Sequence, residues 1–275
     1  MIQIKTPNVC VFESALFRTT STVVITKDLV LVVDPTWLPH EIQQITNLVG
    51  TLRGERPLYL LFTHSDYDHI IGYNAFPGAT VIASQAFIDN PDRDKNIQQI
   101  LTFDDQYYIR RPYKIEYPKV DIIVEKDEQE LIIGETVLTF YLTPGHNIDG
   151  IFTIVEFENQ RIWIAGDYLS NVEFPFIYHS SFAYKRALVK AEQIMKQSHI
   201  DLLIPGHGDA TMDEAEMINR IQDSSAYIRS VREALQDGKE FSTEALFQRY
   251  GFPGIMQKYH DENMALLKKE MGAGH

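Results

Sequence analysis

The densest group of metal-capable side chains lies in Thr63-His64-Ser65-Asp66-Tyr67-Asp68-His69, directly after the apolar run Leu58-Tyr59-Leu60-Leu61-Phe62. Imidazoles and carboxylates of this kind bind metal ions. The apolar run predicts a strand, so the loop that leaves it can direct His64 and Asp66 toward one point and Asp68 and His69 toward a second. Two ions about 3.5–4 Å apart form a hydrolytic centre. The alternative is a polar loop whose histidines only cap and hydrogen-bond.

Three further donors occur later in the chain. They end the segments Leu142-Thr143-Pro144-Gly145-His146, Ile164-Ala165-Gly166-Asp167 and Ile204-Pro205-Gly206-His207. Each follows an apolar, strand-like run and a Gly or Pro-Gly break, which predicts a loop at the carboxyl end of a strand. Ligands of open sheets bind at this edge. The sequence therefore predicts that these side chains complete the two metal sites.

With these motifs in this order, the chain resembles the metallo-β-lactamase superfamily over roughly residues 20–210. The superfamily signature reads H-x-H-x-D-H, followed by Gly-His, by Gly-Asp or a similar pair, and by a last Gly-His. Asp66 stands where the signature has its second histidine, and the similar flavodiiron proteins also carry a carboxylate there. The resemblance implies a first metal on His64, Asp66 and His146, a second metal on Asp68, His69 and His207, and Asp167 as the bridge.

The fold that the resemblance implies is an α/β (α+β) four-layer αβ/βα sandwich, formed as a single domain over residues 1–275. The apolar pattern agrees, because two β-rich halves each carry part of the ligand set. We expect a hairpin of Thr22–Ile25 and Leu29–Asp34, a helix near Pro39, strands at Leu58–Phe62, 131–133, 136–142, 151–157 and 161–165, a helix over about 181–198, and a strand at Leu202–Pro205.

Two segments are additional to the elements of the sandwich. Residues 86–120 form an insertion that contains a helix-like piece around Asn96–Leu101 and a tyrosine-rich stretch. We interpret it as a lid over the site or one wall of the pocket, with simple surface packing as the alternative. Residues 211–275 form a helical C-terminal extension with helical patterns at 212–236 and 254–271. The last helix is also a candidate contact in a homodimer.

Composition limits the partners and the compartment. The formal net charge is −13, which argues against a general affinity for the phosphate backbone of nucleic acid. No apolar run of about 18 residues is present, and the first residues lack the pattern of a signal peptide. The single cysteine, Cys10, excludes an internal disulfide. These features predict a cytoplasmic protein that does not associate with a membrane. We expect it to act on a small-molecule substrate.

Several residues outside the ligand set are candidates for weaker roles. Asp34 follows a strand and is expected to support the loops rather than bind metal. His179 is a candidate for a contact with a metal-binding side chain or with the substrate. The basic group Arg110, Arg111 and Lys114 is either a solvated edge of the insertion or a contact for a phosphate. The aromatic residues expected to line an apolar pocket are Phe17, Trp37, Phe174, Phe176 and Tyr178.

The resulting hypothesis is a dinuclear metal-dependent hydrolase in which a metal-bridging hydroxide cleaves an ester, lactone or thioester bond. The catalytic residues are Asp68, which orients the water, and Asp167. We expect two divalent transition-metal ions, with zinc first and iron or manganese as alternatives because Asp66 is a harder ligand than histidine. The alternative functions are a non-hydrolytic di-iron redox protein and a phosphodiesterase of the same fold.

Overall fold

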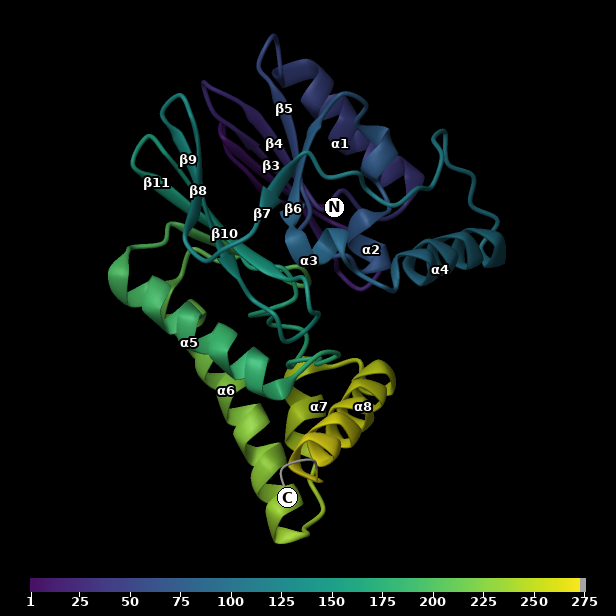
Figure 1. Cartoon of the computed structure of the whole chain (residues 1–275), viewed down its shortest axis with the longest axis vertical. Helices are drawn as coiled ribbons and strands as arrows, with labels where there is room; N and C mark the ends of the chain where they lie inside the picture. Colours follow the sequence, from purple (N-terminus) through teal and green to yellow (C-terminus); the bar gives the residue numbers. More distant parts are fainter. Residues whose placement is uncertain (273–275) are drawn as a thin grey trace.

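A computed structural model of the protein describes residues 1–272, and its centre is two β-sheets that face each other (Figure 1). The first sheet has seven strands in chain order. Its first four strands are antiparallel, and the pairs from β4 to β7 are parallel. The strands are β1 (Ile2–Lys5), β2 (Val9–Glu13), β3 (Thr20–Ile25), β4 (Val30–Val33), β5 (Leu58–Leu61), β6 (Thr80–Ser84) and β7 (Ile122–Val124).

The second sheet has five strands in the order β12-β11-β10-β9-β8. Its strand pairs are antiparallel, except that β11 and β12 run parallel. These strands are β8 (Gln129–Ile133), β9 (Thr136–Leu142), β10 (Ile151–Phe157), β11 (Gln160–Ile164) and β12 (Leu202–Ile204). The parallel β11–β12 pair brings the loops after both strands to one edge of the sheet, where Asp167 and His207 follow.

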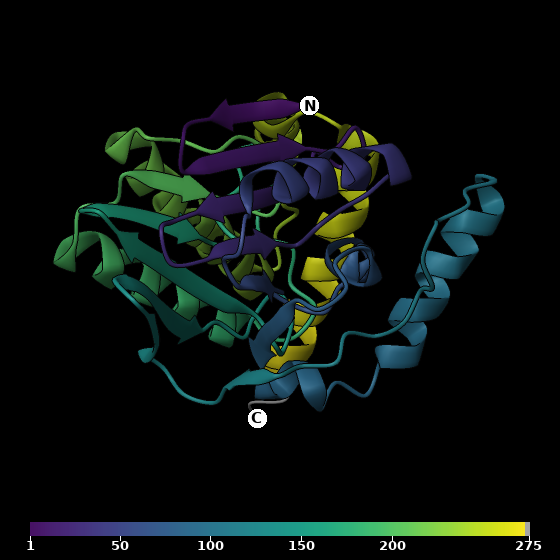
Figure 2. The ribbon, with the colours of Figure 1, turned by 90° about the horizontal axis from the view of Figure 1, so that it is seen from above.

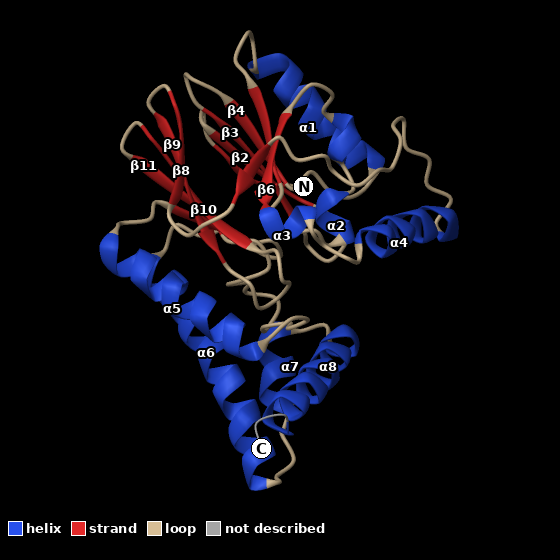
Figure 3. Ribbon diagram, viewed as in Figure 1, coloured by secondary structure: helices blue, strands red, loops and turns tan. Residues whose placement is uncertain are grey.

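Helices cover the outer face of each sheet (Figure 3). Between the sheets lies a core that includes Leu31, Leu61, Phe140 and Val155. Strands β4 and β5 are therefore covered on both faces, which explains their nearly continuous apolar sequences. The helices are α1 (Pro39–Leu52), α2 (Tyr67–Ile70), α3 (Gln85–Ile88), α4 (Arg93–Gln106), α5 (Ser181–Gln197), α6 (Glu214–Asp237), α7 (Glu244–Tyr250) and α8 (Pro253–Gly272), with a 3-10 turn η1 (Tyr73–Ala75).

The layers confirm the predicted αβ/βα sandwich. Helix α1 begins at Pro39, as expected for proline in a first turn, and it buries Ile42, Ile45 and Val49 against the first sheet. On the second sheet, α5 packs against the outer face and α6 packs against α5, in a core cluster that includes Leu188 and Ile228. Among the described residues, no helix is both long and apolar enough to cross a membrane.

The inserted segment 86–120 consists of α3, α4 and an irregular return to the first sheet. Figure 2 shows α4 projecting from the rest of the molecule. The expectation of a solvated basic edge is wrong for Arg111, whose side chain is only 2% exposed. Its guanidinium pairs with Asp104 at 2.7 Å and donates to the Trp37 carbonyl at 2.7 Å. Arg111 therefore attaches the insertion to the domain.

The C-terminal extension is helical, as predicted, and it folds back beneath the carboxyl ends of the strands (Figure 1). Asn263 of α8 is fully buried and makes three hydrogen bonds. Its Oδ1 accepts from the Ile177 N–H at 2.9 Å, and its Nδ2 donates to the Pro175 carbonyl at 2.6 Å and to the Tyr227 hydroxyl at 2.9 Å. The buried face of α8 thus holds the loop 175–177 of the same chain. A homodimer contact through this helix stays a prediction.

The substitution Asn263→Ala should destabilise the protein by about 1–3 kcal/mol, because it leaves buried backbone groups of the 175–177 loop without a partner. Urea unfolding of both proteins measures this difference. The matched control is Asn219→Ala, since Asn219 is exposed on α6. Equal urea midpoints for Asn263→Ala and the unchanged protein would show that α8 does not hold the loop.

Candidate metal centre

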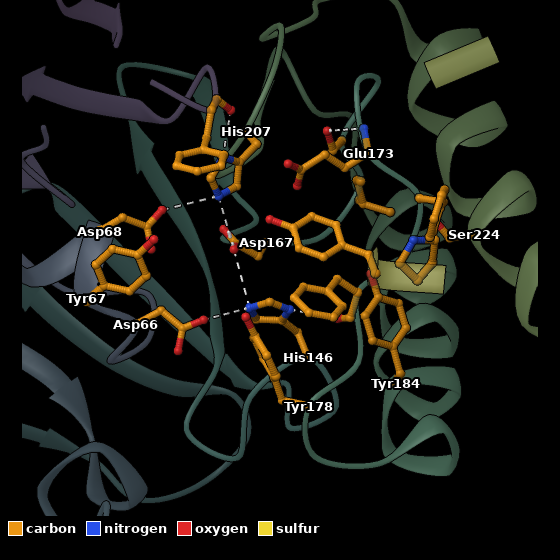
Figure 4. A pocket seen from close by; sticks show the side chains of 17 residues that line it. Asp66, Tyr67, Asp68, His146, Asp167, Glu173, Tyr178, Tyr184, His207 and Ser224 are labelled. Carbon is orange, nitrogen blue, oxygen red and sulfur yellow. Dashed lines mark hydrogen bonds and ion pairs between the residues drawn. The ribbon is translucent and has the colours of Figure 1, made fainter. Parts of the chain in front are cut away.

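The structure brings all seven predicted donors to one edge, where strands of both sheets end (Figure 4 labels five of them). His64 lies in the loop after β5, and Asp66 immediately precedes α2, which carries Asp68 and His69. The remaining donors come from the second sheet and follow three different strands: His146 after β9, Asp167 after β11 and His207 after β12. Residues far apart in the sequence therefore share one small volume.

The donors fall into two groups whose ligand atoms lie within 4.8 Å of one another. The first group is His64, Asp66, His146 and Asp167, and the second group is Asp68, His69 and His207. This division agrees with the two ligand sets that the superfamily resemblance implies. The resemblance implies that Asp167 serves both metals, and this role stays a prediction.

The Asp167 carboxylate lies between the two groups. Its Oδ2 is 3.3 Å from His146 Nε2 and 3.2 Å from His207 Nε2. The same oxygen is 3.6 Å from His64 Nε2, and Oδ1 is 3.1 Å from His69 Nε2. Four imidazoles thus face one carboxylate with the same ring nitrogen. This arrangement suits a ligand shared by two ions.

Buried atoms without hydrogen-bond partners show that these residues fit metal ions. His64 Nε2, His69 Nε2 and Asp167 Oδ1 are buried and make no hydrogen bond in the described structure. Leaving such an atom unpaired costs about 1–3 kcal/mol. Four imidazole nitrogens and three carboxylates are a suitable donor set for two divalent transition metals, which would satisfy all three atoms.

The second nitrogen of each imidazole is held by the protein, and this contact aims Nε2 at the centre. His69 Nδ1 lies 3.0 Å from Asp34 Oδ2, which fits the expectation that Asp34 supports the loops. Asp34 Oδ2 also accepts from the Thr63 hydroxyl at 2.6 Å. The other three partners are Thr63 Oγ1 for His64 at 3.0 Å, the Phe176 carbonyl for His146 at 2.8 Å and the Phe17 carbonyl for His207 at 2.9 Å.

The carboxylates favour protonated imidazoles at His146 and His207 before any metal binds. Burial lowers the pKa of His146, but Asp66 and Asp167 raise it by more, to about 9. Burial likewise opposes the effect of Asp167 on His207, whose pKa rises to about 10. The imidazoles in turn outweigh burial at Asp66 and hold the pKa of its carboxyl well below the usual range. Metal binding must therefore displace protons.

A small cavity of about 60 Å³ opens beside the donors. Phe17, Phe174, Phe176 and Tyr178 line it, as the sequence predicts. Trp37 does not, because its ring is buried in the core against Tyr67 and Phe103. The cavity also includes residues that the sequence did not single out: Tyr67, Glu173, Tyr184, Ser224 and Tyr259.

The insertion lines a groove that adjoins the cavity. Lys95 and Gln99 of α4 form one side of a more open groove, which shares Asp66, Tyr67 and Tyr178 with the cavity. Within the described chain, no residue of 86–120 lines the cavity at the metal donors. The insertion is therefore a wall of the adjoining groove, and a lid over the donors stays a prediction.

The other weaker candidates lie apart from the donors. His179 lines the groove with an exposed side chain, and its backbone N–H donates to the His146 carbonyl at 3.2 Å. Arg110 and Lys114 are exposed and line neither the cavity nor the groove. The Asp66 carboxylate instead receives a hydrogen bond of 2.6 Å from the Asn147 amide.

Metal loading should release at least two protons per chain at pH 7, because the pKa values of His146 and His207 are about 9 and 10 before metal binds. The apparent affinity should rise with pH up to these values and fall on acidification. Zinc titration calorimetry in two buffers of different ionisation enthalpy measures the release. Replacing the exposed His199 by alanine should leave it unchanged. Identical enthalpies in both buffers would contradict the raised pKa values.

Comparison with known proteins places the chain in a family. The sequence profile of the metallo-beta-lactamase superfamily matches residues 15–207. No curated protein matches.

Similar solved structures agree in fold. A HARLDQ-motif mutant of the metallo-beta-lactamase from Cronobacter sakazakii is 18% identical, with a TM-score of 0.61 over 87% of this chain and 99% of that one. A metallo-beta-lactamase family protein from Thermus thermophilus is 17% identical, with a TM-score of 0.64 over 98% and 95%. The sec-alkylsulfatase Pisa1 from Pseudomonas sp. is 12% identical, with a TM-score of 0.68 over 97% of this chain but 49% of the sulfatase. At these identities the likeness concerns the fold alone, whereas the match over residues 15–207 shows that the chain belongs to the metallo-beta-lactamase superfamily.

Proposed function

We propose that this protein is a dinuclear metal-dependent hydrolase that cleaves an ester, lactone or thioester bond of a small molecule. The observation that carries the proposal is the convergence of four histidine Nε2 atoms on Asp167, which leaves buried ligand atoms without hydrogen bonds. Zinc is the expected metal, with iron or manganese as alternatives because a carboxylate at Asp66 is a harder ligand than imidazole.

The metal ions, when bound, supply hydroxide as the nucleophile and polarise the bond that is attacked. The protein contributes position and proton handling. Asp68 lines the cavity, and its Oδ2 lies 3.5 Å from His69 Nε2 and 3.6 Å from His207 Nε2. We assign to this carboxylate the roles of orienting the attacking water and accepting its proton. The only cysteine, Cys10, is buried in β2 and plays no part.

The charges around the cavity favour a scissile group that carries no negative charge. Two divalent ions bring four positive charges, three aspartates remove three, and the hydroxide removes the last. Among residues 1–272, no lysine or arginine lines the cavity, and Lys95 is the one such residue that lines the groove. Phosphodiesters and sulfate esters are anions, so they would gain little from this site. The net charge of −13 also repels anions at long range.

With a panel of neutral esters, lactones and thioesters, the metal-loaded protein should show a kcat/KM at least about tenfold higher than with a phosphodiester or a sulfate ester. Activity should rise into mildly alkaline pH, because a centre without excess positive charge acidifies its water less. The matched variant Asp66→His restores one positive charge, so its pH profile should shift to lower pH.

Steady-state rates against pH, with chelator-treated protein as the blank, provide the test. A phosphodiester turned over faster than every neutral substrate would refute the preference for neutral bonds. Absence of turnover with all of these substrates would refute hydrolysis itself.

A further inference from the structure

One carboxylate in the cavity has no role in the centre described above. Glu173 lies six residues after Asp167, and its backbone N–H donates to the Ser170 hydroxyl at 3.1 Å. The side chain lines the cavity together with Asp68, Asp167 and His207, and Figure 4 shows its carboxylate pointing into that space. Within residues 1–272, this carboxylate has no hydrogen bond or ion pair. It is therefore free to contact a bound molecule.

The aromatic side chains that line the same cavity are packed against each other. The Phe176 ring stacks on Tyr259 with centroids 3.9 Å apart, and its centroid is 4.3 Å from that of Tyr178. Tyr67 and Phe174 add two more rings to the lining. Aromatic faces carry partial negative charge and attract cations. The cavity is thus lined by aromatic rings and a free carboxylate, and none of the described residues that line it is a lysine or arginine.

An ionised carboxylate in a cavity that already holds Asp68 and Asp167 is stabilised by a positive partner. Burial raises the pKa of Glu173, and the negative charges of Asp167 and Asp68 raise it further, while His207 lowers it. His207 binds a metal only as the neutral imidazole, so its positive charge is absent in the loaded protein. The charges of the ions are already offset by the three aspartates and hydroxide. None of the described residues that line the cavity is a lysine or arginine, so a cationic group on the bound molecule is the partner that would stabilise the ionised Glu173 carboxylate.

We propose that this cavity recognises a primary alkylammonium group on the substrate, with Glu173 as its ion-pair partner and the rings of Phe176, Tyr178 and Tyr259 as cation–π partners. A primary ammonium group can donate hydrogen bonds to the Glu173 carboxylate, which a quaternary one cannot. Glu173 is thus a specificity residue. The inference rests on the proposed hydrolase function and narrows its substrate class to amine-bearing esters, lactones or thioesters.

Binding of a non-reactive probe tests this without turnover. The metal-loaded protein is titrated at pH 7 with n-propylammonium chloride and, separately, with 1-propanol, and ligand-observed NMR gives both dissociation constants. The ammonium ion should bind at least about tenfold more tightly than the alcohol. Glu173→Gln should remove this preference, Glu173→Asp should retain most of it, and Glu192→Gln, which neutralises an exposed acid on α5, should retain all of it. Elemental analysis confirms equal metal content in all variants.

Equal affinities for the two probes in the unchanged protein would overturn the inference even if Glu173→Gln does not fold. A preference that survives in folded, metal-loaded Glu173→Gln would overturn it as well. Hydrolysis by the unchanged protein of a butanoyl ester, or of the same ester with a terminal amine on its acyl chain, reports separately on the proposed function. Probe binding as predicted without any hydrolysis would retain the ammonium site and reject the hydrolase, and hydrolysis without probe preference would do the reverse.

Discussion

The Asp167 carboxylate is the group on which the whole site depends, because histidines from loops of both sheets aim their Nε2 atoms at it. Such close approach requires space at the strand ends. A Cβ on Gly206 would lie 2.1 Å from Asp167 Oδ1, and a Cβ on Gly145 would lie 2.5 Å from the backbone of Tyr184. Glycine before His146 and His207 is therefore a steric requirement of the centre.

The surrounding fold explains why these ligands are held in place. Each imidazole is fixed through Nδ1 by a backbone carbonyl, a threonine hydroxyl or Asp34. The C-terminal extension participates in this support. Asn263 of α8 binds backbone groups on both sides of Phe176, whose carbonyl receives the His146 contact. A helix outside the family match at residues 15–207 thus stabilises a ligand of the first metal group.

The ligand set could be predicted from the sequence because its donors share one local pattern, an apolar strand followed by a glycine or a dense His-Asp cluster. The two sheets followed from the same strands. Glu173 and Tyr259 could not be found in this way, since they come from an irregular loop and from the last helix, and only the folded chain brings them to the cavity. Arg111 was misinterpreted as an exposed residue, because charge does not reveal a buried ion pair.

Metal content of two variants tests the shared carboxylate most directly. Asp167→Ala and His146→Ala are reconstituted with zinc, confirmed as folded by circular dichroism, and compared with the unchanged protein by elemental analysis. Since Asp167 contacts both groups of donors, its loss should empty both sites, whereas the loss of His146 should mainly empty the first. Loss of one equivalent in each variant would contradict the view that Asp167 joins the two sites.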